Sequence, residues 1–331
     1  MVYIKFTNSY DYTGKAYYSF FVLPLLKIFK AKNIFVEMEV LNGKDVVPDI
    51  EFFSVFGNKE DLINSKAKHK IFFTGENVSV SSIAGPRKQY SDHCLQHTAL
   101  SLGFDFGKAE NYLRLPLWLL YYFRPYDSKD VIQHKLTEFA ATEKKEKFCA
   151  LIARHDTTEY VREYGEDSSY LVPGNSNNLR TEMYNKISQI GQVDCPGFLL
   201  HNDASLKTQF SDNKDVYLRQ YKFNICPENS QSPGYVTEKI FDAFHAGCIP
   251  VYNGYSSDPE PGIINPQAIL WFERGKDNAE TLERLKQLYE NEREYDDFQE
   301  QGFFVDSAVD GIHGYLQAYC EQMENIALQC I

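Results

Sequence analysis

One continuous stretch, residues 221–254, constrains the fold of this chain more than any other; it reads YKFNICPENSQSPGYVTEKIFDAFHAGCIPVYNG. Aromatic and β-branched residues at its start predict a strand, and the Pro, Ser and Gly residues behind them form turns. Apolar residues then repeat with helical spacing from Tyr235 to Gly247, which suits a left-handed helix cap. Strand composition returns at 249–252, where Pro250 bars a longer helix. The stretch therefore predicts a βαβ unit.

Charge is concentrated at the entrance of the expected helix, where Glu238 and Lys239 stand in the first turn. The unpaired N–H groups of a helix N-terminus favour negative charge, and βαβ units bind phosphates at the carboxyl ends of their strands. A lysine there can neutralise a diphosphate, and a carboxylate beside it can accept hydrogen bonds from ribose hydroxyls. The structural alternative is that Glu238 complements the helix dipole and Lys239 is solvated.

The order of residues in this stretch resembles the signature of the α1,3/4-fucosyltransferase family: Pro-Glu-Asn-Ser, then Gly-Tyr-Val-Thr-Glu-Lys, then Ala-Gly-Cys-Ile-Pro-Val-Tyr. That family takes fucose from GDP-fucose, so the resemblance implies a site for this donor. Pro227 departs from the pattern, because an aromatic residue usually precedes the Glu-Asn pair. Asn229 and Tyr235 match positions that hold the fucose and the nucleotide in the family. As alternatives, Asn229 fixes the turn through its side chain and Tyr235 belongs to the core.

A second cation for the diphosphate is expected where the chain reads Leu-Arg-Thr-Glu-Met-Tyr, from Leu179. This segment looks like the Arg-bearing helix start of the family, and a guanidinium matches the paired oxygens of a diphosphate. The resemblance implies a phosphate contact for Arg180, with a surface ion pair as the alternative. Upstream, Arg154-His155 stands where relatives usually have Ser-Asn, and the polar stretch 156–178 looks like an insertion.

A candidate general base follows the apolar run Ile-Phe-Phe at residues 71–73, which predicts a short buried strand. Glu76 comes next, after a glycine turn, at the carboxyl end where α/β sheets place chemistry. On the residues alone, a turn or N-cap carboxylate is the simpler interpretation of Glu76. The pattern Thr-Gly-Glu-Asn, followed by Gly-Phe-Asp at 103–105 and Tyr-Leu-Arg-Leu-Pro at 112–116, is similar to that of bacterial fucosyltransferases. The resemblance implies that Glu76 deprotonates the acceptor hydroxyl.

The length of 331 residues favours two domains, and strand-like runs alternate with helical ones through both halves. The predicted fold class is α/β, with two Rossmann-like domains facing a cleft, which is the GT-B glycosyltransferase fold. Residues 1–147 are expected to bind the acceptor and hold the base, residues 148–308 to bind GDP-fucose, and the helix at 309–331 to pack back on the first domain. Further expectations are a linker at 143–147, helices at 117–140, 179–189 and 278–301, and a strand at 196–200.

The composition excludes some partners and indicates a compartment. A net charge of −12 and a pI near 5.2 argue against nucleic acid and against an anionic membrane surface. Seven widely spaced cysteines without a Cys-x-x-Cys pair favour reduced thiols. No signal peptide or long apolar run is visible. We therefore expect a cytoplasmic protein, free or peripheral to the inner membrane, of open oligomeric state.

Metal dependence is not expected. His93 and His97 have the i, i+4 spacing of a zinc-binding pair on a helix, but no glutamate follows His93 and no third ligand is near. The sequence also lacks an Asp-x-Asp motif near a strand end. No cofactor is therefore predicted to be required, and a divalent cation would at most stimulate the reaction.

These patterns together predict an inverting glycosyltransferase. By resemblance, it moves L-fucose from GDP-fucose to O3 of N-acetylglucosamine in a Galβ1,4-GlcNAc acceptor. One alternative is a catalytically silent, glycan-binding homologue, and a second is a transferase for another nucleotide-linked sugar. A glycoside hydrolase would need two facing carboxylates. Glu76 and Glu238 instead fall in separate expected domains, and Lys239 would have no role.

Overall fold

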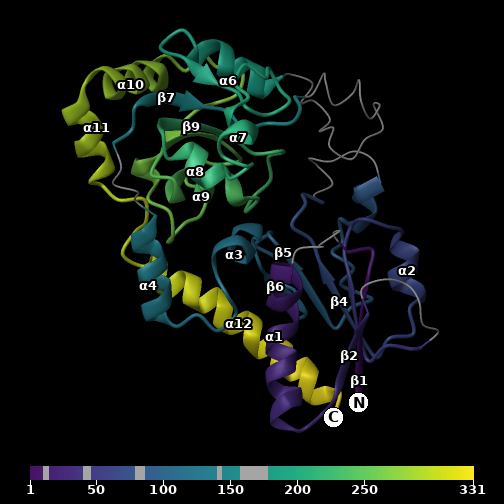
Figure 1. Cartoon of the computed structure of the whole chain (residues 1–331). Coiled ribbons are helices and arrows are strands. Elements are labelled where there is room, and N and C mark those ends of the chain that lie inside the picture. The colour runs from purple at the N-terminus through teal and green to yellow at the C-terminus, as the bar shows by residue number, and fades with distance from the viewer. Residues whose placement is uncertain (10–14, 40–45, 79–85, 140–143, 157–177) are drawn as a thin grey trace. The chain divides into compact units, whose positions relative to one another are not determined.

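The computed structural model describes residues 1–9, 15–39, 46–78, 86–139, 144–156 and 178–331 (Figure 1). The chain divides into two compact units. Unit 1 comprises residues 1–130 and 310–331, and unit 2 comprises residues 131–309. Most of the insertion-like stretch 156–178 lies outside the described residues. The predicted fold class is confirmed at the level of α/β architecture, because each unit is a Rossmann-like parallel sheet with helices.

Unit 1 is built on a parallel sheet in the order β2-β1-β3-β4-β5-β6. Its central strands are buried along most of their length, because helices cover parallel sheets on both faces and select continuous apolar runs such as Ile-Phe-Phe in β4. The strands are β1 (Val2–Thr7), β2 (Val36–Glu39), β3 (Ile50–Phe53), β4 (His69–Phe73), β5 (Leu100–Gly103) and β6 (Tyr112–Arg114).

Helices from both ends of the chain pack together in unit 1. The tilted rings of Tyr319 and Phe20 have centroids 5.1 Å apart, and the Tyr319 hydroxyl donates a hydrogen bond to the Phe20 carbonyl at 3.3 Å. The C-terminal helix therefore packs against the N-terminal helix of unit 1. The helices of this unit are α1 (Lys15–Ala31), which continues through Pro24, α2 (Lys59–Asn64), a 3₁₀ turn (Pro86–Tyr90), α3 (Leu117–Tyr122) and α12 (Ala308–Gln329).

Unit 2 has a second parallel sheet, in the order β11-β10-β9-β7-β8. Helices α6, α10 and α11 pack apolar side chains against one face of the sheet. The strands are β7 (Lys147–Ala150), β8 (Val193–Asp194), β9 (Tyr221–Pro227), β10 (Ile249–Asn253) and β11 (Leu270–Trp271). The helices are α4 (Lys129–Glu138), which begins in unit 1, α6 (Leu179–Ile187), α7 (Ser205–Thr208), α8 (Lys214–Leu218), α9 (Glu238–His245), a 3₁₀ turn (Pro266–Ala268), α10 (Ala279–Glu290) and α11 (Glu292–Gln299).

Two predicted helices are each broken into a pair. The helix expected over 278–301 divides into α10 and α11, because Asn291 has an extended backbone and its side chain accepts a hydrogen bond from the N–H of Glu294, which caps α11. The helix expected over 117–140 divides into α3 and α4. There Pro125 lies in a turn in which the Asp127 side chain accepts from the N–H of Arg124 at 2.8 Å.

Three further boundaries differ from the predictions. Residues 196–200 form bends rather than a strand, and strand pairing ends at Asp194. The helix expected from Tyr235 begins at Glu238, because Thr237 has an extended backbone. The end of the expected linker belongs to unit 2: Lys145 is buried and donates to the carbonyls of Arg219 and Ala246.

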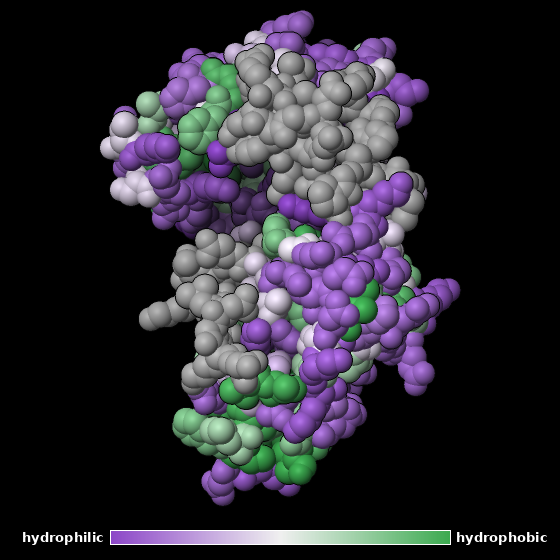
Figure 2. Space-filling model, turned by 90° about the vertical axis from the view of Figure 1, so that its right-hand side faces the viewer, coloured by the Kyte–Doolittle hydropathy of each residue, from purple (hydrophilic) through white to green (hydrophobic). Residues whose placement is uncertain are grey.

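Figure 2 shows a face that is mostly hydrophilic, with a group of hydrophobic residues at its lower end. In unit 1, exposed apolar side chains precede strands: Met1 is 80% exposed, Phe35 70% and Val47 60%. They lie at the amino edge of the sheet, opposite the edge at which Glu76 follows β4. No helix within the described ranges is long and apolar enough to cross a membrane.

Candidate active site

A pocket lies in unit 2 at the carboxyl ends of β7 and β9. The connections from these two neighbouring strands run in opposite directions along the sheet, to β8 and to β10. Open α/β sheets bind ligands at such a switch point. The pocket combines apolar walls with three cations and two carboxylates. Its lining residues are Ile152, Ala153, Arg180, Lys214, Leu218, Asn224, Ile225, Cys226, Pro227, Glu238, Lys239 and Asp242.

The entrance of α9 is shaped by a buried carboxylate, Glu228. Thr237, the residue before the helix, donates to it twice, from its N–H at 2.9 Å and from its hydroxyl at 2.7 Å. The hydroxyl of Tyr252 lies 3.3 Å from the same group. Burial raises the pKa of Glu228, and the Lys239 ammonium opposes that effect. Glu228 therefore closes the turn between β9 and α9 and places the first turn of the helix beside the pocket.

Lys239 brings positive charge to this first turn. Its Nζ is 3.4 Å from Glu238 Oε1 and 3.9 Å from Glu228 Oε2, and it donates to the Thr237 hydroxyl at 3.1 Å. Burial alone would lower the pKa of Lys239, but the two carboxylates outweigh it and raise the pKa above its usual value. Lys239 is therefore a permanent cation in the pocket.

Glu238 lines the same pocket and is the first residue of α9. Burial would raise its pKa, but Lys239, its own backbone N–H and Lys214 together lower it. The carboxylate is thus ionised and can only accept hydrogen bonds. Hydroxyl groups of a bound ligand are suitable donors to it.

Arg180, the second residue of α6, supplies the second predicted cation. Its Nη2 donates to Asn229 Oδ1 at 2.7 Å, and its Nη1 donates to the carbonyl of His155. Burial lowers the pKa of Arg180, whereas the nearby carboxylate of Asp156 acts in the opposite direction. Asp156 also accepts from the N–H of Thr181 at 2.7 Å, so it holds the start of α6 in place. His155, at the point of departure from the family pattern, thus contributes its backbone to the site.

The two other predicted donor-site residues lie in the turn before α9. Asn229 is exposed and bonded to Arg180, which links this turn to α6. Tyr235 is 3% exposed, and its N–H donates to the Ser232 carbonyl at 3.0 Å. The structure thus brings Arg180, Asn229, Glu238 and Lys239 to one place, and it buries Tyr235 in the turn before α9.

Sequence reasoning missed several polar residues of the pocket region, among them Asp242. Lys214 is a third cation, at the start of α8. Asn224 lies in β9, is 6% exposed and has a buried Oδ1 without a hydrogen-bond partner in the described part of the chain. Glu228 stands inside the Pro-Glu-Asn-Ser motif, shortly before the expected helix. Its position in the motif could have identified it as part of the site. The position of Lys214 depends on tertiary packing and has no such local signal.

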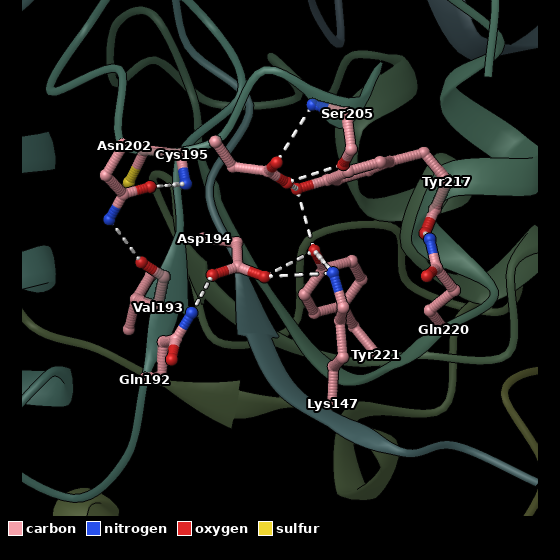
Figure 3. A network of polar contacts seen from close by, with 11 residues as sticks. Lys147, Gln192, Val193, Asp194, Cys195, Asn202, Ser205, Tyr217, Gln220 and Tyr221 are labelled. Carbon is pink, nitrogen blue, oxygen red and sulfur yellow. Dashed lines mark hydrogen bonds and ion pairs between the residues drawn. The ribbon is translucent and has the colours of Figure 1, made fainter. Parts of the chain in front are cut away.

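A polar network in unit 2 supports α8 (Figure 3). The hydroxyl of Tyr221 donates to Asp194 Oδ2 at 2.7 Å and lies 2.7 Å from the hydroxyl of Tyr217 on α8. Tyr217 in turn donates to Asp203 at 2.7 Å, and Lys147 lies 3.2 Å from Asp194. Since Tyr217 and Lys214 share α8, this network holds the helix that brings Lys214 to the pocket.

We expect Tyr221→Phe to lower the free energy of unfolding by about 1–3 kcal/mol, because buried Asp194 and Tyr217 each lose one hydrogen-bond partner. Equilibrium denaturation would measure the change. Tyr255→Phe is the matched control, since Tyr255 is 58% exposed and should change stability by less than about 0.5 kcal/mol. Equal effects from both substitutions would show that the network contributes nothing to stability.

Glu76, the predicted base, belongs to unit 1 and follows β4 at the carboxyl edge of that sheet. The side chain of Thr74 binds its backbone on both sides, accepting from the N–H of Glu76 at 3.0 Å and donating to its carbonyl at 2.8 Å. Its carboxylate is 17% exposed and forms an ion pair with Arg87 at 2.7 Å. Thr74 therefore fixes the backbone of Glu76 and Arg87 orients its carboxylate, which remains partly accessible to solvent.

His93 and His97 do not lie on a helix, although their i, i+4 spacing fits a zinc-binding pair on one. His93 has a φ of 52°, so the two residues do not share a helix face. Its Nε2 lies 2.5 Å from Asp105 Oδ2. Among the described residues, no group of three or more potential metal ligands comes together.

Comparison with known proteins agrees with this architecture. Residues 8–121 match the family model described as alpha-(1,3)-fucosyltransferase FucT N-terminal domain, and residues 170–325 match glycosyltransferase family 10 (fucosyltransferase) C-term. A solved structure titled as an alpha1,3-fucosyltransferase with GDP-fucose aligns with a TM-score of 0.60 and 22% identity, over 97% of this chain and 90% of that one.

Two curated relatives show how far the similarity extends. Alpha-(1,3)-fucosyltransferase FucT of Helicobacter pylori is 28% identical over 75% of this chain and 50% of its own length. The human 4-galactosyl-N-acetylglucosaminide 3-alpha-L-fucosyltransferase 9 is 25% identical over 37% of this chain and 32% of its own length. The chain thus spans about half the length of the bacterial relative. Because its two halves match the two domain models of one kind of enzyme, the chain belongs to the glycosyltransferase family 10 fucosyltransferases.

Proposed function

We propose that this chain is an inverting α1,3-fucosyltransferase that uses GDP-fucose as its donor. The observation that carries the proposal is the pocket at the switch point of unit 2, which Arg180, Lys214 and Lys239 line together with the ionised Glu238. A nucleoside diphosphate has the matching groups, namely clustered negative charge and ribose hydroxyls. The solved relative with GDP-fucose supports this identity for the donor.

In the proposed complex, Arg180 and Lys239 bind the diphosphate and Glu238 accepts hydrogen bonds from the ribose. A guanidinium is suited to paired phosphate oxygens, and an ammonium acts as a compact charge. In the same complex, Asn229, which is bonded to Arg180, and the buried Tyr235 hold the fucose and the nucleotide.

The chemical step is a single displacement at C1 of fucose. The acceptor oxygen forms a bond to C1, and the bond from C1 to the β-phosphate oxygen breaks, with its electron pair leaving on GDP. The acceptor hydroxyl loses its proton to Glu76. Because the new bond forms opposite the breaking one, a β-linked donor gives an α-fucoside. Arg180 and Lys239 stabilise the charge that develops on the leaving diphosphate.

For the acceptor, we propose O3 of N-acetylglucosamine in a Galβ1,4-GlcNAc unit. The name of the human relative includes this kind of acceptor, a 4-galactosyl-N-acetylglucosaminide. The matched N-terminal domain model covers the part of the chain that contains Glu76.

The test is incubation of the protein with GDP-fucose and N-acetyllactosamine, followed by assay of released GDP and of a fucosylated trisaccharide by mass. Formation of both products is the expected result. Binding of the acceptor without turnover would favour a silent glycan-binding homologue. Turnover with another nucleotide sugar in a donor panel would point to a different transferase.

We expect activity to persist after treatment with EDTA, because fixed cations of the chain would stabilise the leaving diphosphate without a metal. The transfer rate before and after chelation, and after addition of Mn²⁺ or Mg²⁺, is the measurement. Stimulation by a cation is compatible with this mechanism. Complete loss of turnover that Mn²⁺ restores would contradict it.

The same proposal includes a cytoplasmic location, free or at the inner membrane. All seven cysteines are free thiols, and six of them are buried. Reduced cysteines are typical of cytosolic proteins. Cell fractionation with antibody detection would test this placement.

A further inference from the structure

A buried arginine stands against the proposed catalytic carboxylate. Arg87 Nη1 lies 2.7 Å from Glu76 Oε2, and the side chains are 8% and 17% exposed. Glu76 and Arg87 are 11 residues apart in the sequence and do not share a helix or a strand. The pair therefore forms through tertiary packing. The sequence patterns that point to Glu76 do not include Arg87.

The 3₁₀ turn that contains Arg87 is attached to the sheet by packing. Tyr90, in the same turn, stacks on Phe72 of β4 with ring centroids 5.4 Å apart, and its hydroxyl donates to the Gly57 carbonyl at 2.8 Å. The guanidinium of Arg87 also lies 5.1 Å from the ring centroid of Phe56, which suits a cation–π contact. Arg87 is therefore held beside the strand that presents Glu76.

The pair leaves one oxygen of Glu76 available. Arg87 engages Oε2, and Thr74 engages only the backbone of Glu76. In the described part of the chain, no hydrogen bond or ion pair engages Oε1. A base needs this arrangement, with one oxygen held for orientation and the other open to the hydroxyl that loses its proton.

We propose that Arg87 is a positioning residue for fucosyl transfer, which holds Oε2 of Glu76 so that Oε1 is turned to receive the acceptor proton. The planar guanidinium fixes direction, which a flexible lysine does less well. This inference rests on the proposed function, because it assigns a role within that reaction.

The experiment is chemical rescue of Arg87→Ala in the full chain, with GDP-fucose and N-acetyllactosamine as substrates. We expect kcat to fall by about 10²-fold, which is typical of a misplaced catalytic group, while GDP affinity and melting temperature stay near the wild-type values. Added guanidinium ion should restore much of the rate with saturation. Arg87→Lys should lose less than Arg87→Ala, because it keeps the charge.

Arg124→Ala is the matched control. Arg124 is an exposed arginine of the same unit whose guanidinium donates to the Phe123 carbonyl at 2.9 Å. This variant should keep its rate and should not respond to guanidinium ion. A response equal to that of Arg87→Ala would show that the rescue is unspecific and would overturn the assignment.

The outcomes separate this inference from the function on which it rests. If wild-type protein transfers fucose and Glu76→Ala does not, but Arg87→Ala keeps its rate, only the inference fails. It also fails if Arg87→Ala and Arg87→Lys lose rate and melting temperature together without rescue, since that describes a structural role. If the wild-type protein transfers no fucose, the proposed function and the inference fail together.

Discussion

Glu76→Ala should lower kcat for fucosyl transfer by about 10²–10⁴-fold, the contribution of a well-placed general base. The affinity for GDP should remain unchanged, because Glu76 belongs to unit 1 whereas the pocket with Arg180 and Lys239 lies in unit 2. Single-turnover kinetics and calorimetric titration with GDP would measure the two quantities separately. Loss of rate without loss of GDP affinity is expected if Glu76 is the base. It is not expected if the carboxylate has only a structural role.

A control is needed because Glu76 also pairs with Arg87, and its removal takes an ion-pair partner from a buried guanidinium. Glu76→Gln keeps the size of the side chain and can still accept from Arg87, so it should fold like the wild type and lose nearly as much rate. Glu321→Ala, an exposed carboxylate on α12, should keep full rate. If Glu76→Ala retained most of its turnover, Glu76 would not be the base, although the pocket in unit 2 would remain a donor site.

Lys239→Met should weaken GDP binding by about 10- to 10²-fold, since a hydrogen bond to a charged group contributes roughly 1.5–3 kcal/mol. The rate should fall further, by about 10²–10³-fold, because the leaving diphosphate gains charge in the transition state. Glu238 and Glu228 raise the pKa of Lys239, so the ammonium is present throughout the working pH range. GDP titration and steady-state kinetics would check both values.

The substitution also removes the cation that faces two carboxylates, so its effect on folding must be measured. Lys239→Arg keeps the charge and should retain part of the affinity. Lys286→Met, an exposed lysine on α10, is the matched control and should bind GDP like the wild type. Unchanged GDP affinity in a folded Lys239→Met variant would place the diphosphate elsewhere and would contradict the proposed donor site.

The candidate site was predictable from sequence where its residues are close together in the chain. Glu238 and Lys239 stand in the first turn of a helix whose start could be placed within a few residues, because turn formers precede it and apolar spacing follows. Arg180 was marked by the resemblance of its segment to the Arg-bearing helix start of the family. In the structure, a hydrogen bond from Arg180 to Asn229 joins these two segments at one pocket.

Other parts of the fold were mispredicted, because local signals compete there. Apolar spacing continues through Asn291 and predicts one helix, yet its side chain caps a second helix, and the chain bends. Similarly, helical spacing extends back to Tyr235, but two hydrogen bonds to the buried Glu228 hold Thr237 extended, in the cap position that threonine favours. In both places a side-chain hydrogen bond outweighs the helix propensity of the neighbouring residues.

By itself, the sequence determined the α/β class of this protein and the location of Glu238 and Lys239 in the first turn of a helix. Both follow from strand and helix periods and turn residues, which act over a few positions. Only the tertiary structure decided which distant side chains meet: Lys214 at the pocket, Glu228 beneath Thr237, and Arg87 against Glu76. The physical reason is that such contacts depend on how strands pair and helices pack. Burial then makes each ion pair or hydrogen bond costly to leave unmade.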